Sequence, residues 1–412
     1  MTTTVTAADN SPKVLISQSG RKGDPGTNGT NGNGFNQVRK SLLDNPLCHL
    51  FKTNKLVETS APTGADSDIT FTRASTATYV DRYGIVKTAA VDTIREEKDG
   101  FLIEQAGTNL VPYSEAFDNA AWTKTGSTVI TPNVTTSPDS IVTADKIDFA
   151  NTNDRLFQGV ANTTAASSTF SIWVKSTGAD RSIRLRLRNS PTTTNFTQTD
   201  FTATSEWQRF SVTLSSLAEN LICELLSIAV DLDFYIWGAQ LEQSPVATSY
   251  IPTVASSVTR LSDAALLPVL NNVATKEFSI FGIVSNTSTA TTGNKFIFRM
   301  PVSSGFFALF YNANNPNQFN FRYDDNSTAV QIAAVITENI KYFAATLDAS
   351  NLKLNINGTE SSISKITDPS VLLTNNLPFF GSTGVAVSSG NIKDFKIYDF
   401  ALNANEIEYL LP

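Results

Sequence analysis

The sequence predicts a mainly β protein in which a short N-terminal segment and a Gly-rich repeat precede two antiparallel β-sandwich (jelly-roll) domains. Charged residues make up only 17% of the 412 residues, and Ser, Thr and Asn separate short apolar runs. That composition is typical of antiparallel sheets with one polar face. Apolar and polar residues also alternate along several runs, which is the period of a strand that buries one face.

Glycine recurs at every third residue in "GRKGDPGTNGTNGNG", residues 20–34. Collagen needs this period because only a hydrogen fits at the axis where three chains meet. We therefore predict a collagen-like neck of three parallel chains, with a flexible Gly/Asn linker as the alternative. Five triplets span only about 45 Å, so the trimer needs further contacts downstream. The neck glycines are Gly20, Gly23, Gly26, Gly29 and Gly32.

Apolar residues follow the repeat in "FNQVRKSLLDNPLCHLFKTNKL". A short helix is expected around Val38 to Leu43, ended by Asp44-Asn45-Pro46. The apolar residues have little to pack against within so short a segment, so we assign them to contacts between the three chains. They are Leu42, Leu43, Leu47, Leu50 and Phe51.

From Thr70 onward, strands and turns are expected. "ATYVDRYGIVKTA" predicts a hairpin turning at Asp81 to Gly84, and Asp99-Gly100 predicts a turn before the strand "FLIE". The stretch "RASTATYVD", the Gly before "IVKTA", and "LIEQAGTNLVPYSEAF" with "AAWTK" resemble a module of bacteriophage head fibres, spikes and some tail fibres. The resemblance covers about residues 70–125 and departs from the family at "IREEKDG". It implies a virion structural protein with a trimerising fibre module at residues 35–107.

Residues 108–255 resemble the carbohydrate-binding jelly rolls that follow this module, in "TFSIWVKS", "EWQRFSVTL" and "FYIWGAQLEQSPVATSYIPT". The alternation of this domain independently predicts one buried sheet face. The residues expected on that face are Phe170, Ile172, Val174, Ile183, Leu185 and Leu187.

Residues 256–412 predict a second sandwich, with strands at "FSIFGIVS", "KFIFRM", "FFALFYN", "QFNFRY" and "YFAATLD". The ending "GNIKDFKIYDFALNANEIEYLL" resembles the last strand and short helix of laminin-G or concanavalin-like lectin domains. This resemblance implies glycan or protein binding, although many such domains are scaffolds.

A carbohydrate-binding surface follows if "TFSIWVKS" and "SIRLRLRNS" pair as a hairpin across "TGAD". Sugars stack on aromatic rings and arginines bind carboxylates bidentately, so such a face suits an acidic bacterial polysaccharide. In the alternative, a loop covers the tryptophan and the arginines pair with local carboxylates. The residues of this candidate surface are Trp173, Lys175, Arg184, Arg186 and Arg188.

Other functions find little support. A net charge of −7 without a Lys/Arg tract disfavours nucleic-acid binding. The sequence contains no run of 18 apolar residues, so we expect no membrane-spanning helix. Cys48 and Cys223 lie far apart and His49 has no second histidine, so we expect no metal, cofactor or catalytic residue, and His49 is expected to be a packed interface residue. A depolymerase would need a pair of catalytic carboxylates. Two pairs of neighbouring acidic residues occur, but the residues around them do not indicate a catalytic site, so we expect no enzyme. These pairs are Asp231 with Asp233 and Asp324 with Asp325.

The expected function is therefore a trimeric bacteriophage fibre. Residues 1–19 are assigned to a peptide that docks onto a capsid or tail protein. The sandwiches are expected to bind a host cell-surface polysaccharide in the assembled virion, after synthesis in the host bacterial cytoplasm. The alternatives are a purely structural or decorative head fibre and, ranked lower, a glycan-cleaving depolymerase.

Overall fold

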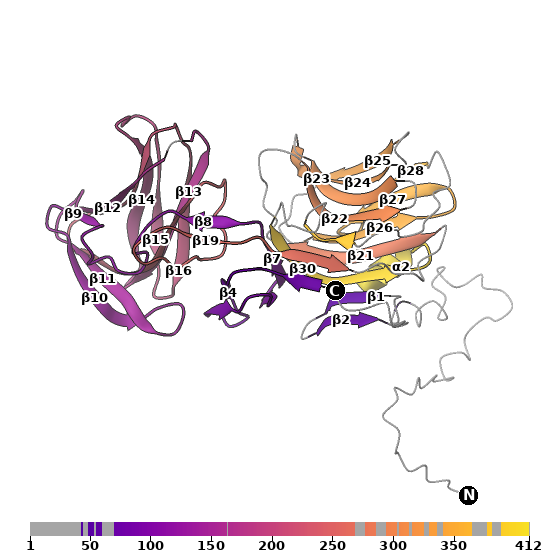
Figure 1. Cartoon of the computed structure of the whole chain (residues 1–412), viewed down its shortest axis with the longest axis horizontal. Coiled ribbons are helices and arrows are strands. Elements are labelled where there is room, and N and C mark those ends of the chain that lie inside the picture. The colour runs from indigo at the N-terminus through magenta and orange to yellow at the C-terminus, as the bar shows by residue number, and fades with distance from the viewer. Residues whose placement is uncertain are drawn as a thin grey trace, which may run out of the picture.

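The computed structural model shows two β-sandwiches that lie side by side along the long axis of the molecule (Figure 1). It describes residue 43 and residues 48–52, 55–59, 70–162, 164–267, 277–285, 294–302, 305–312, 315–324, 329–335, 341–364, 377–380 and 389–411. The expected anchor and collagen-like neck, with Leu42 and Leu47, lie outside these residues. Neighbouring strands pair antiparallel in both sandwiches.

The first sandwich consists of two five-stranded sheets with orders β10-β11-β18-β13-β16 and β15-β14-β17-β12-β9. Its strands are β9 (Thr123–Thr125), β10 (Val129–Thr136), β11 (Val142–Phe149), β12 (Arg155–Val160), β13 (Ser167–Ser176), β14 (Arg181–Ser190), β15 (Phe196–Ala203), β16 (Gln208–Ser215), β17 (Asn220–Leu226) and β18 (Leu232–Glu242).

The predicted alternation of the first sandwich is confirmed. All six residues expected on the buried face are fully inaccessible, and they share one core with Trp122, Phe149 and Phe234. Burial of each large apolar side chain contributes roughly 1.5–3 kcal/mol, so this core stabilises the contact between the two sheets.

The second sandwich places a nine-stranded sheet over the four-stranded sheet β22-β23-β24-β25. The main path of the larger sheet is β2-β1-β30-β21-β26-β27-β28. Strand β7 pairs with β30 of this path, and β6 pairs with β7. A three-stranded sheet, β29-β20-β3, completes the domain. The strands are β1 (Cys48–Lys52), β2 (Lys55–Thr59), β3 (Thr70–Thr72), β6 (Arg95–Glu97), β7 (Gly100–Ile103), β20 (Ala264–Leu267), β21 (Phe278–Ser285), β22 (Lys295–Val302), β23 (Gly305–Asn312), β24 (Asn315–Asp324), β25 (Ala329–Val335), β26 (Lys341–Leu347), β27 (Asn351–Ile356), β28 (Thr359–Ser364), β29 (Leu377–Pro378) and β30 (Gly390–Tyr398).

The expected strand and helix at the C-terminal end are present as β30 and α2 (Ala404–Leu410). Asn403 caps the helix: its side chain accepts from the Glu406 N–H at 3.1 Å, and the Glu406 carboxylate accepts from the Asn403 N–H at 2.9 Å. Such a reciprocal pair satisfies two backbone donors that the first helical turn leaves free. Ile407 is buried and fixes the helix against the larger sheet.

Several strands that precede residue 107 pair within the sheets of the second sandwich, namely β1, β2, β3, β6 and β7. Strand β1 pairs with β30, placing Leu50 opposite Phe395, and β7 pairs with the other part of β30. Leu43 is 1% exposed and packs with Tyr398, whose hydroxyl donates to the Leu43 carbonyl at 3.0 Å. Leu43 was expected to pack between chains because its own short segment offers few partners, and the structure shows that the C-terminal sheet of the same chain covers it. The role of the segment in a trimer stays a prediction.

The predicted hairpin is confirmed as β4 (Ala77–Val80) and β5 (Val86–Ala89), and it lies between the two sandwiches (Figure 1). Gly84 closes its turn at φ +82°, a conformation that glycine adopts without a steric penalty. Beside it, β8 (Gly107–Asn109) pairs with β19 (Val258–Arg260), so the chain enters and leaves the first sandwich through one two-stranded ribbon.

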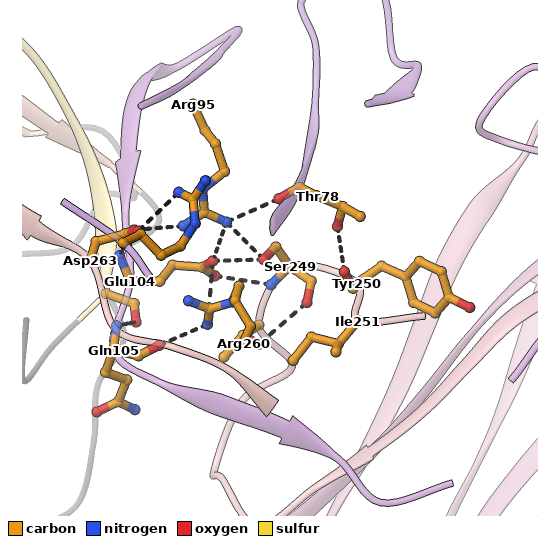
Figure 2. Close-up of polar contacts among 12 residues, drawn as sticks. Thr78, Arg95, Glu104, Gln105, Ser249, Tyr250, Ile251, Arg260 and Asp263 are labelled. Atoms are coloured by element: carbon orange, nitrogen blue, oxygen red, sulfur yellow. Dashed lines mark hydrogen bonds and ion pairs between the residues drawn. The ribbon is translucent and has the colours of Figure 1, made fainter. Parts of the chain in front are cut away.

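A buried ionic cluster, shown in Figure 2, joins the segments that meet at this junction. The guanidinium of Arg95 contacts Glu104 at 2.7 Å and Asp263 at 2.6 Å. Arg73 also pairs with Asp263 at 3.2 Å, and Ser249, in the last loop of the first sandwich, donates its N–H and hydroxyl to Glu104 at 2.9 and 2.7 Å. The cluster therefore connects the last loop of the first sandwich to the segment of residues 73–104 and to the start of the second sandwich.

Arginines keep Glu104 ionised within this cluster. Burial alone would raise the pKa of Glu104, but the guanidinium groups of Arg260 and Arg95 outweigh it and lower that pKa to about 2. Because the carboxylate is 4% exposed, removing it strands two cations in a site with little water.

We predict that Glu104→Gln lowers the free energy of unfolding by about 3–5 kcal/mol, the usual effect of breaking a buried pair. The matched control, Glu96→Gln, removes the partner of Arg82 in an exposed pair at 3.0 Å and should cost less than about 1 kcal/mol. Urea unfolding at about pH 7 measures both. Equal effects for the two variants contradict the assignment.

The same pair predicts a dependence on pH. The folded-state pKa of Glu104 lies below its ordinary value of 4.5, so its contribution is present above that value and is lost as the pH falls toward 2. The parent protein should therefore lose more stability than Glu104→Gln between about pH 5 and pH 2. If the free energies of unfolding of the parent and of Glu104→Gln fall equally between these pH values, Glu104 does not have the lowered pKa described here.

Candidate binding cleft at the junction of the two sandwiches

A cleft of about 430 Å³ lies where the two sandwiches meet. Its walls come from β4, the β6–β7 hairpin, the outer face of β13 and β16, the loop 246–250, and residues 389–391 at the start of β30. Its volume falls within the range of about 300–1,000 Å³ typical of small-ligand sites, which often occur at domain interfaces. Neither sandwich forms this cleft alone.

Trp173 lies on the wall formed by the first sandwich. In the register of the sheet it is opposite Arg209 on β16 and Trp237 on β18. It is 9% exposed because Val86 of the β4–β5 hairpin and Tyr250 pack over the same face. Gly238, at φ +64°, makes this packing possible, since a Cβ there would lie 3.2 Å from Cδ1 of Trp173 and 3.3 Å from the Tyr250 ring.

Arg209 holds the loop that forms the rim of the cleft. Its guanidinium donates to the Thr248 carbonyl at 2.7 Å and to the Ser171 hydroxyl at 3.0 Å. Glu242 supports the loop from behind by accepting from the Thr248 N–H at 2.8 Å and its hydroxyl at 2.7 Å. Burial lowers the pKa of Arg209 and raises the pKa of Glu242.

The opposite wall carries Glu97 and Tyr79. Glu97 accepts from the Val80 N–H at 3.0 Å and from the Asn391 amide at 2.9 Å, so it fixes the β4 wall to the second sandwich. Burial raises the pKa of Glu97. The half-buried Tyr79 adds an aromatic ring to the lining. The cleft thus combines aromatic surface with donors and acceptors from both domains.

The structure separates the residues of the candidate surface predicted from the sequence. The hairpin pairing is wrong: β13 pairs with β16 and β18, whereas β14 pairs with β15 and β17 of the opposite sheet. Trp173 and Lys175 therefore lie on the outer face of one sheet, and the three arginines lie on the outer face of the other. Alternation shows which face of a strand is buried but not which strands are neighbours, and both sheets bury the same core.

The three arginines have carboxylate partners. Arg184 binds Asp200 through two hydrogen bonds of 2.6 and 2.8 Å, and Arg186 and Arg188 pair with the buried Glu224. Together with the covered Trp173, these contacts correspond to the alternative in which the face is structural. Whether any of these residues contacts sugar stays a prediction.

Three residues that line the junction cleft were not predicted from the sequence: Arg209, Tyr79 and Glu97. The segments "EWQRFSVTL" and "ATYVD" predicted strands, and nothing in them shows that Arg209 lies opposite Trp173 or that both face the β4 wall. Only the pairing of β13 with β16 brings these side chains together.

The acidic pairs considered for catalysis lie outside the cleft. Asp231 is exposed, and Asp233 pairs with Lys146 at 3.3 Å and with Arg181. Asp324 pairs with Arg322 at 2.5 Å, and Asp325 lies outside the described residues. The part of the chain that the structure describes contains no cluster of three metal-ligating side chains and no helix long and apolar enough to span a membrane. The side chain of His49 is not among the described features.

Comparison with known proteins identifies the fold of the second sandwich. Residues 259–408 match the family model described as the concanavalin A-like lectin/glucanases superfamily. No curated protein sequence matches the chain.

Solved structures give low similarity scores. The binding domain of botulinum neurotoxin serotype D matches with 17% identity and a TM-score of 0.30, over 36% of this chain and 39% of the toxin chain. The Ruminococcus gnavus IT-sialidase CBM40 bound to α2,3 sialyllactose matches with 13% identity and a TM-score of 0.30, over 36% of this chain and 93% of that chain. The chain thus spans about two fifths of the first of these structures. The C-terminal sandwich is thus similar to the concanavalin A-like lectin/glucanases superfamily over residues 259–408.

Proposed function

We propose that this chain is a structural subunit of a bacteriophage virion fibre. In this proposal it is a homotrimer anchored to a capsid or tail protein by residues 1–19, and it presents two β-sandwiches to a glycan of the host cell surface. The protein is made in the host bacterial cytoplasm and functions in the virion.

The location of the fibre-like motifs supports the structural part of this proposal. Arg73 and Thr78 belong to "RASTATYVD", and Glu104 and Asn109 belong to "LIEQAGTNL". Arg73 and Glu104 are members of the ionic cluster, Thr78 donates to the Tyr250 carbonyl, and the Asn109 amide donates to the Ala239 and Ile251 carbonyls at 3.0 and 2.8 Å. The motif therefore acts as a rigid connector between two sandwiches, as a fibre exposed to shear requires.

The junction cleft is the observation that carries the binding part. Sugars offer C–H faces to aromatic rings and hydroxyl groups to polar side chains. The half-buried Tyr79 supplies aromatic surface, with a small contribution from the 9% exposed Trp173. Glu97, Arg209 and Ser249 supply hydrogen-bonding groups within the same lining. Its volume of about 430 Å³ exceeds those of two other clefts in the described part of the chain, which measure about 200 and 230 Å³.

We propose binding without cleavage. Glycosidases use one carboxylic acid to protonate the leaving group and one free carboxylate opposite it. Glu104 is held ionised by Arg95 and Arg260, and both oxygens of Glu97 already accept hydrogen bonds. The cleft carboxylates are therefore committed to holding its walls, and no reducing sugar should be released from a bound polysaccharide.

Tyr79→Ala tests the location of glycan binding. Loss of the aromatic wall should weaken adsorption to host cells by about tenfold, the effect of roughly 1.4 kcal/mol. Tyr83→Ala is the matched control, because Tyr83 is 80% exposed at the tip of the same hairpin and does not line the cleft. Adsorption is measured by binding of the labelled full-length chain to intact cells. Parental adsorption by Tyr79→Ala, or loss in Tyr83→Ala alone, removes the cleft from the proposal. If the parent does not adsorb to cells, the chain is a decorative fibre.

The assembly is predicted to be a parallel homotrimer. The Gly-x-y register of residues 20–34 supports this, because three collagen-like chains must be in parallel register. Analytical ultracentrifugation of the full-length chain measures its mass. A stable monomer contradicts the trimer.

Deletion of residues 1–19 tests the anchor. This segment precedes the glycine repeat and carries no alternating apolar pattern, so the deletion should leave the trimer intact and abolish incorporation into virions. Immunoblots of purified particles measure incorporation, and sedimentation of the deleted protein is the control. Normal incorporation without the segment refutes the anchor.

A further inference from the structure

We propose that the junction cleft recognises a carboxylate of an acidic saccharide, and that Arg209 is the residue that binds this carboxylate. The inference rests on the glycan-binding function proposed above and names the chemical class of the ligand. It also moves the recognition of acidic sugar from the arginines of β14 to a different residue on the opposite sheet.

Arg209 is a partly buried cation without a contacting counter-ion. No carboxylate of the described residues forms an ion pair with it, whereas Arg184, Arg186 and Arg188 each have one. The nearest attraction comes from Glu242 and Glu104 at longer range, and hydrogen bonds from Thr248 and Ser249 already occupy those carboxylates. A guanidinium stays charged in proteins, so its burial is unfavourable until an anion contacts it.

The guanidinium retains free donors. It carries five N–H bonds, of which one donates to Thr248 and one to Ser171, while the Nε–H is buried without a partner. Each terminal nitrogen therefore keeps one N–H bond that no described residue uses. These two nitrogens form the fork that binds the two oxygens of a carboxylate.

The surrounding wall is short of acceptors. The indole Nε1–H of Trp173, directly opposite Arg209 in the register, is also buried without a hydrogen-bond partner among the described residues. Buried donors left unpaired cost about 1–3 kcal/mol each. Two such unpaired donors, the Nε–H of Arg209 and the Nε1–H of Trp173, therefore lie on neighbouring strands in this wall.

The lining contains one cation among its described residues. Its charged side chains are Glu97, Glu104 and Arg209. Arg95 and Arg260 pair with Glu104, and Glu97 accepts hydrogen bonds from the Val80 N–H and the Asn391 amide. Arg209 is therefore the group of the described lining that offers a positive charge to a bound anion.

An array of bacterial surface polysaccharides tests the proposal, with each polymer presented in its native form and after chemical reduction of its carboxylates to primary alcohols. Reduction keeps the sugar ring and linkages and removes only the anion. The full-length protein should bind carboxylated polymers, and reduction should weaken this binding by about tenfold or more, as expected for loss of a charge-assisted pair.

Variants of Arg209 locate the contact. Arg209→Gln should bind the native polymer no better than the parent binds the reduced one, and Arg209→Lys should recover only part of the affinity because it lacks the planar fork. The matched control is Arg184→Gln on the opposite sheet, which removes an exposed pair with Asp200 and should leave binding unchanged. Circular dichroism and thermal unfolding check that each variant is folded.

A measurement on the parent protein covers the case in which Arg209→Gln does not fold, because Arg209 also holds the Thr248 loop. Phenylglyoxal modifies accessible arginines, and mass spectrometry reports the rate at each one. Bound native polymer should slow modification of Arg209 and leave Arg184 unchanged, whereas the reduced polymer should protect neither.

The outcomes separate this inference from the function on which it rests. Equal binding of native and reduced polymers overturns the carboxylate and leaves glycan binding intact. Loss of binding or protection at Arg184 rather than Arg209 overturns the location. Absence of binding to every polymer on the array overturns the proposed glycan function together with this inference.

Discussion

The architecture depends on the buried contact of Arg95 with Glu104 and Asp263. Arg95 and Glu104 lie on the segment that precedes the first sandwich, and Asp263 lies at the start of the second. Ser249, in the last loop of the first sandwich, donates to Glu104. A buried charge is tolerated only when fixed partners surround it. Because Ser249 of the first sandwich donates to a carboxylate that Arg95 and Arg260 hold in place, satisfying these groups also links the first sandwich to the second.

The cleft is a consequence of that constraint. Its walls come from β4, the 246–250 loop and the start of β30, and Glu97 and Ser249 connect those walls through hydrogen bonds. The shape of the binding surface is therefore coupled to the ionic cluster beside it. A change that loosens the junction would alter ligand binding without touching a contact residue.

The arginines of the first sandwich illustrate how tertiary contacts distinguish structural from recognition residues. On the face of β14, Asp200 and Glu224 satisfy Arg184, Arg186 and Arg188, so these residues stabilise the exposed sheet. Arg209, on the other sheet, donates to a carbonyl and a hydroxyl and forms no ion pair with a carboxylate of the described residues. The difference lies in the partners across the strands and not in the residue type.

The amino-acid pattern alone determined the β-sandwich class, the six core residues of β13 and β14 and the hairpin around Gly84, because each depends on local periodicity or turn chemistry. The helix that follows β30 was expected from a family resemblance. The sequence could not determine that β13 and β14 belong to opposite sheets, that β1 and β7 join the C-terminal sandwich, or that Trp173 lies opposite Arg209. These features depend on pairings between distant strands, and the alternation of one strand is the same whichever neighbour it has. Only the tertiary structure therefore decided which side chains meet in the cleft.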